Sequence, residues 1–189
     1  MRSLTLFKNQ KKDNFVFLNI ASLDDKKNHF LLLESFKILG QQFKNIELRI
    51  GGQGILENKL IDHANKLGLN NVKFLGALDR NQVKQEFINS DAFVLSSDVE
   101  TFGVVVIESL AIGRPVISTK CGGPEFIINS DNGIIVEPNN TKELSDAMKT
   151  MIQCFSDYNL REISAQCIKK YGSNAIAKSL VEIYTKALS

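Results

Sequence analysis

The hydrophobic pattern of the chain alternates short apolar runs, rich in β-branched residues, with longer stretches in which apolar residues recur at helical spacing. The short runs predict six strands, at residues 15–21, 46–51, 72–75, 92–95, 115–118 and 133–136. After the first run, Leu32, Leu33, Phe36 and Leu39 share one helical face. Helices are predicted likewise after the second, third, fourth and sixth runs. The stretches 157–170 and 173–187 predict two more, the second of them a terminal helix.

The order of these elements indicates the fold class. Strand and helix alternate, and the strands are apolar on both faces, which is typical of a parallel sheet covered by helices on each side. With right-handed crossovers the result is an α/β, Rossmann-like doubly wound parallel sheet of about six strands. Ligands of such sheets bind beyond the carboxyl ends of the strands. We therefore expect the chemistry in the loops that follow each strand.

Length and composition fit one ordinary globular domain. The 189 residues are 43% hydrophobic and 23% charged, and the net charge of +2 is scattered instead of forming a basic stripe, which argues against a nucleic-acid partner. No apolar run is long enough to span a bilayer, and the first 15 residues hold no signal-peptide core. We expect a cytoplasmic, single Rossmann-like domain over residues 13–189, preceded by a poorly ordered lead-in at 1–12.

The candidate chemistry follows the fourth predicted strand, in the segment 96–116. Glu100 lies in the strand-to-helix loop, and Phe102 and Gly103 lead into the next helix. The free N–H groups and the dipole at the start of that helix suit a diphosphate. Gly103 lets the backbone approach such a ligand closely, since it has no side chain. Glu108 lies on the second turn, about 7–8 Å further along the helix axis.

Two carboxylates thus flank one predicted anion site. A nucleotide-sugar has the same layout, with sugar hydroxyls, a diphosphate and ribose hydroxyls in order, and carboxylates form strong hydrogen bonds to hydroxyls. Isolated glutamates are more often simply solvated. Glu108, however, interrupts an otherwise apolar helix that we expect to be largely covered, where its carboxylate would need a partner.

The text around these residues resembles the retaining glycosyltransferases of family 4. Glu100 and Glu108 match the E-x7-E motif of that family, within a longer match E-x-F-G…E-S-L-A-x-G-x-P-V-I. Further blocks at 71–76, 90–96 and 122–125 agree in order and spacing, so that the resemblance covers roughly residues 15–150. It implies a GT-B fold of two facing Rossmann-like domains, of which this chain is the C-terminal, nucleotide-sugar-binding one.

The resemblance also implies roles for individual residues. Glu100 and Lys27 would be the catalytic residues, Glu100 beside the donor sugar and Lys27 at the diphosphate. Glu108 would hold the ribose hydroxyls. The backbone amides that would meet the sugar hydroxyls and the diphosphate are those of Phe102, Gly103 and Val104. The residues that would border the base through their backbone are Gly76, Ala77 and Leu78.

One position departs from the family pattern. Family members often carry an arginine after the first strand and a lysine five residues later, both serving the diphosphate. Lys27 matches the lysine, but Ser22 stands where the arginine is common. A hydroxyl cannot replace the bidentate contacts of a guanidinium. Ser22 therefore remains a candidate binding residue, and either Lys26 and Lys27 supply the charge or donor binding is weaker.

Other patterns point to no further cofactor. The glycine run 51–54 lacks the last glycine of a dinucleotide fingerprint, and no D-x-D metal clamp is present. Cys121, Cys154 and Cys167 read as reduced, mostly buried thiols and not as a metal site. We expect a UDP- or GDP-linked sugar as the donor, with no metal and no other cofactor.

The sequence therefore predicts one component of a hexosyltransferase-type enzyme, with an acceptor glycan or glycolipid bound by an N-terminal domain that the chain lacks. Alone, the chain would bind donor without efficient turnover. Peripheral contact with the inner face of a membrane would come only through the missing half. The alternative is a non-catalytic nucleotide-binding or structural module derived from the same family. Ser22 favours this alternative, whereas Glu100, Gly103 and Glu108 argue against it.

Overall fold

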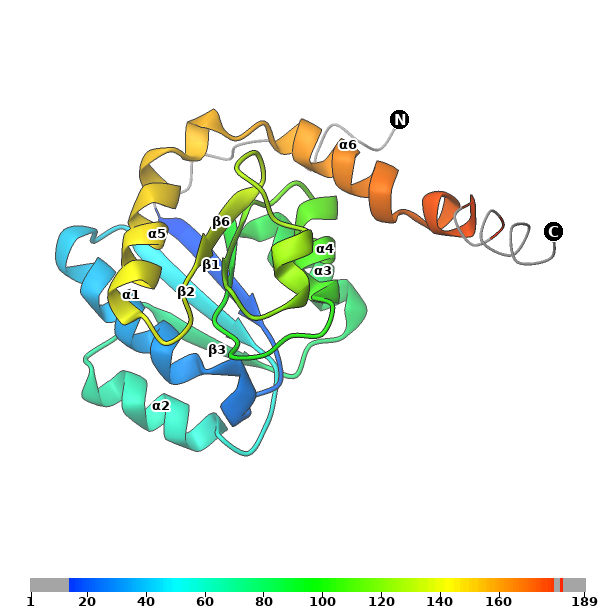
Figure 1. Ribbon diagram of the computed structural model, residues 1–189. Helices are drawn as coiled ribbons and strands as arrows, with labels where there is room; N and C mark the ends of the chain where they lie inside the picture. The colour runs from blue at the N-terminus through cyan, green and yellow to red at the C-terminus, as the bar shows by residue number, and fades with distance from the viewer. Residues whose placement is uncertain (1–13, 179–180, 182–189) are drawn as a thin grey trace.

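The computed structural model describes residues 14–178 and residue 181, and its centre is one sheet of six parallel strands (Figure 1). The strands are β1 (Phe15–Ile20), β2 (Ile46–Gly51), β3 (Val72–Gly76), β4 (Ala92–Leu95), β5 (Val116–Thr119) and β6 (Gly133–Val136). They are ordered β3-β2-β1-β4-β5-β6, and every neighbouring pair is parallel. The predicted six strands and the doubly wound, Rossmann-like fold are confirmed.

Helices connect the strands and cover both faces. The α-helices are α1 (His29–Gln42), α2 (Glu57–Lys66), α3 (Arg80–Asn89), α4 (Val104–Ala111), α5 (Thr141–Gln153) and α6 (Leu160–Tyr171). Three short 3-10 helices are η1 (Asp25–Lys27), η2 (Gly123–Phe126) and η3 (Phe155–Asp157). The helix predicted at 157–170 begins later than expected, at Leu160, because η3 precedes it and the Asn159 side chain accepts the N–H of Glu162 to cap it.

Two parts of the predicted domain layout fall at the ends of the chain. Residues 173–178 and 181 are helical, in line with the terminal helix expected at 173–187. The remainder of that stretch, and the lead-in at 1–12, lie outside the described residues.

The two faces of the sheet belong to separate apolar clusters because successive strand residues point to opposite sides. Phe17 of β1 and Val94 of β4 belong to the cluster that includes α1, α2 and α5. Leu18 and Phe93 belong to the cluster that includes α3, α4 and α6. Figure 1 shows this arrangement, with α1, α2 and α5 on one side of the sheet and α3 and α4 on the other.

The strand order places a topological switch point between β1 and β4. The chain runs from β1 outward through β2 to β3, then returns to β4 beside β1 and runs outward through β5 to β6. The loops that follow β1 and β4 therefore leave the sheet in opposite directions and open a crevice between them. The segments singled out from the sequence, 22–27 and 96–103, are these two loops.

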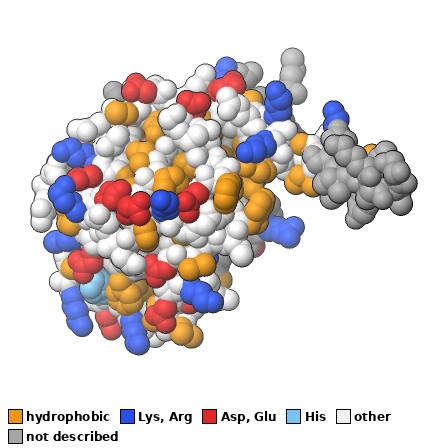
Figure 2. All heavy atoms as spheres, in the orientation of Figure 1, with side chains coloured by type: hydrophobic (Ala, Val, Ile, Leu, Met, Phe, Trp, Pro, Cys, Tyr) orange, Lys and Arg blue, Asp and Glu red, His pale blue; other side chains and the backbone are white. Residues whose placement is uncertain are grey.

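The surface carries no concentrated charge on the face seen in Figure 2, where Lys and Arg are interspersed with acidic and apolar side chains. No helix in the described part of the chain is long and apolar enough to cross a membrane.

Candidate functional site

An ion pair joins the two loops at the switch point. Lys27, the last residue of η1, places its Nζ 2.6 Å from Oε2 of Glu100 in the loop after β4. Each side chain is only about one-fifth exposed, at 21% and 17%. Water and salt screen a pair in this position less than they screen a surface pair, but the pair also remains open to a ligand.

The backbone that carries Lys27 is tied to the β4 loop by three further hydrogen bonds. Ser96 Oγ donates to the carbonyl of Lys27 at 2.8 Å, and the N–H of Asp98 donates to the carbonyl of Lys26 at 2.9 Å. Asn28 Nδ2 donates to the carboxylate of Asp98 at 2.8 Å. The two loops thus form one unit, and Lys27 does not depend on its own turn alone for its position.

A buried polar contact lies beneath this unit. Asn19 Nδ2 donates to the carbonyl of Val94 at 2.8 Å, so Asn19 Oδ1 is the acceptor for His29 Nε2 at 3.0 Å. Burial lowers the pKa of His29 to about 4, and the charge of Lys27 lowers it further while that of Asp24 opposes the shift. His29 is therefore neutral near pH 7, and its hydrogen bond joins the start of α1 to β1.

The start of α4 faces the same crevice. Gly103 is the N-cap with φ 81° and ψ 48°, and no side chain caps the helix. A Cβ at Gly103 would lie 3.2 Å from Cγ of Pro124, and the left-handed φ is itself costly for other residues. The first N–H groups of α4 have no partner within the helix, which makes them available to an anion.

The crevice consists of two adjoining open hollows that share Ile20, Val104 and Val105. The first, of about 390 Å³, is lined by Ala21, Ser22, Lys27, Leu95, Glu100, Thr101, Phe102 and Gly103 in addition to the shared residues. The second, of about 650 Å³, is lined by Leu78, Arg80, Val83 and Glu108 in addition to them. The predicted site residues thus meet in one crevice, except that Gly76 and Ala77 line neither hollow.

Two site residues differ from expectation in their surroundings. Glu108 is exposed, so the prediction that its carboxylate would be covered is wrong; α4 turns this side toward the open crevice, and Val104 is likewise 60% exposed. Ser22 Oγ donates to Oδ2 of Asp24 at 2.6 Å, and this hydrogen bond is the main cause of a lowered pKa for Asp24. A hydroxyl–carboxylate contact therefore occupies the place where the family often carries an arginine.

Arg80 is a crevice residue that the sequence reasoning missed. It is the first residue of α3, directly after the Asp79 N-cap that follows β3. The sequence could have indicated it, because ligands of such sheets bind beyond the carboxyl ends of the strands. Arg80 follows β3 just as Lys27 follows β1 and Glu100 follows β4.

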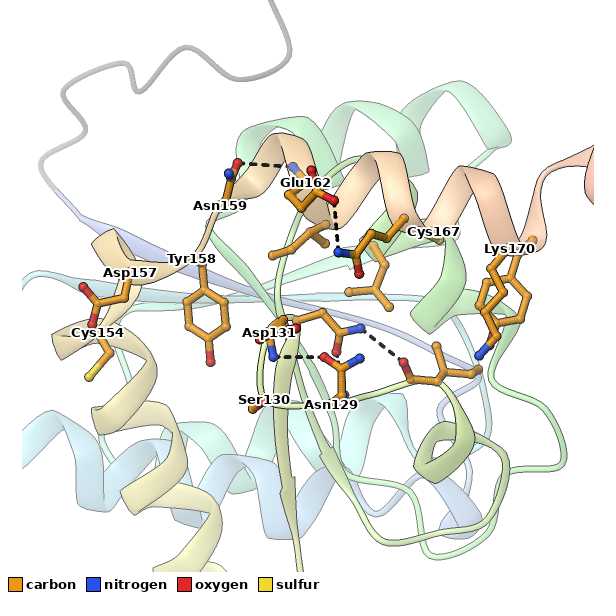
Figure 3. Close-up of a pocket in the computed structure, with 16 residues that line it drawn as sticks. Asn129, Ser130, Asp131, Cys154, Asp157, Tyr158, Asn159, Glu162, Cys167 and Lys170 are labelled. Carbon is orange, nitrogen blue, oxygen red and sulfur yellow. Dashed lines mark hydrogen bonds between the residues drawn. The ribbon is translucent and has the colours of Figure 1, made fainter.

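Another cavity, more enclosed than the crevice and of about 470 Å³, lies elsewhere (Figure 3). Glu162 and Cys167 project from α6 on one side of it, and Asn129, Ser130 and Asp131 lie on the loop that enters β6 (Figure 3). This loop is at the amino ends of the strands, away from the switch point. The start of α6 in its lining is capped by the side chain of Asn159, and the crevice remains the candidate site. Cys154 and Cys167 line the more enclosed cavity, and both thiols are free, as is that of Cys121. Burial raises the pKa of Cys167 to about 11. Within the described residues no group of three His, Cys, Asp or Glu could hold a metal ion.

Comparison with known proteins agrees with this geometry. Residues 2–170 match the family described as glycosyl transferases group 1. The chain is 41% identical over 124 residues to the uncharacterized glycosyltransferase MJ1059 of Methanocaldococcus jannaschii, covering 65% of this chain and 30% of that protein. It is 32% identical over 144 residues to N-acetylgalactosamine-N,N'-diacetylbacillosaminyl-diphospho-undecaprenol 4-alpha-N-acetylgalactosaminyltransferase of Campylobacter jejuni, covering 75% of this chain and 38% of that enzyme.

Solved structures share the fold. Anabaena Alr3699/HepE, crystallised in complex with UDP-glucose, superposes with a TM-score of 0.80 at 23% identity, over 92% of this chain and 49% of that one. The chain spans less than half the length of each of these three proteins. With the match over residues 2–170, the six-stranded sheet and the crevice at its switch point, the chain belongs to the glycosyl transferases group 1 family.

Proposed function

We propose that this chain is the C-terminal, donor-binding half of a retaining glycosyltransferase of family 4, and that the crevice holds a UDP- or GDP-linked sugar. One observation carries the proposal. The Lys27–Glu100 pair and the uncapped start of α4 line one hollow, and Glu108 lines the adjoining hollow. Cation, helix start and carboxylate thus line one crevice, and a nucleotide-sugar offers a matching group to each.

Each group has a chemical task in this proposal. The Lys27 ammonium and the N–H groups at the start of α4 would offset the charge of the diphosphate. Glu100 would accept hydrogen bonds from the sugar hydroxyls, and Glu108 from the two ribose hydroxyls. The backbone at Phe102, Gly103 and Val104 would approach the diphosphate, which the absence of a side chain at Gly103 permits.

The reaction would transfer the sugar with retention of its anomeric configuration. The bond from the anomeric carbon to the diphosphate oxygen breaks, and the diphosphate leaves with the electron pair. The acceptor hydroxyl oxygen bonds to the anomeric carbon, and its proton goes to the departing diphosphate. The contribution of this chain would be positioning and stabilisation of the developing charge, both large terms in enzymatic catalysis.

The rim of the crevice fits a second domain. Exposed apolar side chains follow β2, β4 and β5, at the same edge of the sheet: Ile55, Val99, Phe102, Val104 and Phe126. Exposed apolar groups gathered at one edge are typical of a surface that another part of a protein covers. We propose that an acceptor-binding domain does so, and that an acceptor glycan or glycolipid, with any membrane contact, belongs to that domain.

A second candidate function is a non-catalytic nucleotide-binding or structural module of the same family. The contact between Ser22 and Asp24 favours it, because a carboxylate near the diphosphate position opposes an anion, and Lys27 is already paired with Glu100. The donor-binding half and a nucleotide-binding module both predict that this chain binds nucleotide, whereas a structural module does not. The first two differ in whether the site supports transfer when an acceptor-binding domain is present.

Calorimetric titration of UDP, GDP and ADP, and then of their sugars, tests the proposal on the 189-residue chain. We expect the preferred nucleotide to bind with a dissociation constant of roughly 10 μM to 1 mM, in the usual substrate range. Glu108→Ala should weaken binding by about tenfold, as expected for the loss of a charge-assisted hydrogen bond. Asp62→Ala, which removes an exposed carboxylate from α2, should not. A folded chain that binds no nucleotide at several millimolar would refute the donor-site proposal.

Transfer assays separate the two candidates. The chain joined to an acceptor-binding domain of its family should release the nucleoside diphosphate and give a product with the donor's anomeric configuration. The chain alone should bind donor without efficient turnover. Donor binding without any transfer in the two-domain protein would favour the non-catalytic module.

A further inference from the structure

The second hollow of the crevice carries two opposite charges that do not pair with each other. Arg80 begins α3 and Glu108 lies on α4, and both line the hollow. Within the described part of the chain, neither side chain makes a hydrogen bond or an ion pair. A guanidinium is a donor only and a carboxylate an acceptor only, so the hollow presents both hydrogen-bonding characters to a ligand.

The position of Arg80 is well defined although its side chain is exposed. The Asp79 carboxylate accepts the N–H groups of Asn81 and Gln82 at 2.8 and 2.9 Å. Gln82 Oε1 in turn accepts the N–H of Asp79 at 2.8 Å, which completes a capping box. The first turn of α3 is therefore stable, and the Arg80 backbone is held at the rim of the hollow.

The floor of the hollow is apolar and suits the face of a planar ring. Leu78, Val83 and Val105 line it together with Ile20. Gly51 at the end of β2 makes room for this floor, because a Cβ there would lie 2.7 Å from Cδ1 of Leu78 and 3.4 Å from Cγ1 of Ile20. A ring lying on these apolar side chains would share the hollow with Arg80.

We propose that Arg80 selects the base of the donor. It favours uracil or guanine, which carry a carbonyl oxygen at position 4 or 6, over cytosine or adenine, which carry an amino group there. This inference rests on the proposed function and deepens it. Glu108 is assigned to the ribose, which leaves the guanidinium as the charged side chain of this hollow for the base. Because it has only donors, it pairs with the carbonyl oxygen O4 of uracil or O6 of guanine. In cytosine and adenine the guanidinium would instead face another hydrogen-bond donor, the amino group at N4 or N6.

Two matched nucleotide pairs test the inference on the 189-residue chain. UDP and CDP differ at position 4 of the pyrimidine in an oxygen or an amino group. GDP and ADP differ likewise at position 6 of the purine, and guanine carries an additional amino group at position 2. We expect UDP to bind about tenfold more tightly than CDP, or GDP more tightly than ADP, as a charge-assisted hydrogen bond provides. Arg80→Gln should reduce that ratio to within about twofold.

Lys84→Gln is the matched control, because it removes an exposed cation from the next turn of α3 that does not line the hollow. It should leave the base ratio unchanged. Circular dichroism and a thermal unfolding curve should show that both variants fold as the parent chain does.

The other outcomes overturn the inference in distinguishable ways. If Arg80→Gln weakens all four nucleotides equally, Arg80 contacts the diphosphate and not the base. If Arg80→Gln leaves all four affinities unchanged, Arg80 does not contact the nucleotide. If the parent chain prefers CDP to UDP or ADP to GDP, the selection is the reverse of the one that we propose. In these three cases the donor-site proposal stands, since nucleotides still bind. Failure of all four nucleotides to bind would refute both.

Discussion

The Nζ atom of Lys27 and Oε2 of Glu100 lie 2.6 Å apart although 73 residues separate them in the chain. Each residue carries a charge that the proposed donor requires, yet in this structure each charge is directed at the other. A diphosphate that binds beside Lys27 therefore competes with Glu100, and a sugar hydroxyl that binds Glu100 would relieve that competition. The pair couples the two halves of the proposed site.

Substitutions of Lys27 and of Glu100 should have opposite effects on the affinity of the chain for a nucleoside diphosphate. Lys27→Met should weaken UDP or GDP by about tenfold or more, since it removes the cation from the diphosphate position. Glu100→Gln should bind UDP or GDP as tightly as the parent or more tightly, because Lys27 is released and a negative charge is removed. It should lose the added affinity for the sugar of the complete donor. Calorimetry with nucleotide and nucleotide-sugar measures both effects.

Lys26→Met provides the control for Lys27→Met. Lys26 is adjacent in η1 and exposed, and it lines neither hollow. An equal loss of affinity in the two variants would mean that general charge, and not the position of Lys27, attracts the diphosphate.

Two glycine substitutions should change stability in opposite directions. Gly103→Ala places a Cβ at φ 81° and 3.2 Å from Pro124, and should cost about 1–2 kcal/mol. Gly40→Ala lies within α1, where a Cβ meets nothing within 4 Å, and should stabilise the chain by about 0.5–1 kcal/mol. Urea unfolding of the two variants gives the free energies. A neutral Gly103→Ala would show that the start of α4 relaxes readily.

Stability should fall as the pH is lowered from 6.5 toward 4 because of His29. Its pKa in the folded chain is about 4, below its ordinary value of 6.5, so in this interval the unfolded chain binds more protons. Stability therefore rises with pH through the interval, and full titration of this one group corresponds to about 3 kcal/mol. The buried Nδ1 has no partner among the described residues that could accept a proton from it.

Urea unfolding at several pH values measures this contribution. His29→Gln, which removes the titrating ring, should flatten the slope of stability against pH between 4 and 6.5. His63→Gln, at the half-buried contact with Glu34, should leave most of that slope in place. Identical slopes in the parent chain and His29→Gln would show that other groups cause the acid sensitivity.

The ribose contact predicts a sugar-specific effect. If Glu108 holds both ribose hydroxyls, the parent chain should bind UDP more tightly than 2′-deoxy-UDP by about tenfold, as loss of a charge-assisted hydrogen bond implies. Glu108→Ala should bind the two nucleotides with nearly equal affinity. If Glu108→Ala keeps the same ratio of affinities for UDP and 2′-deoxy-UDP, the ribose binds in another part of the crevice.

Much of the fold could be predicted because its signals are local. The runs at residues 46–51 and 92–95 are strands at those bounds, because short apolar segments between helical patterns form the buried strands of a doubly wound fold. The predicted burial of Glu108 is wrong because a local pattern does not show which side of a helix stays open in the folded chain. The apolar sequence of α4 predicts a covered helix, whereas Val104 and Glu108 face the open edge of the crevice.

Local patterns along the chain predict the order of strands and helices, and they place Lys27, Glu100 and Gly103 after the strands that meet at the switch point. Spacing along the chain carries that information, because strand ends and helix starts depend on neighbouring residues. The folded arrangement, in contrast, is needed to know that Lys27 pairs with Glu100 and that Ser22 donates a hydrogen bond to Asp24. It is also needed to know that Arg80 and Glu108 line one hollow without pairing with each other. Side-chain partners from different loops depend on distances in space, which no local pattern encodes.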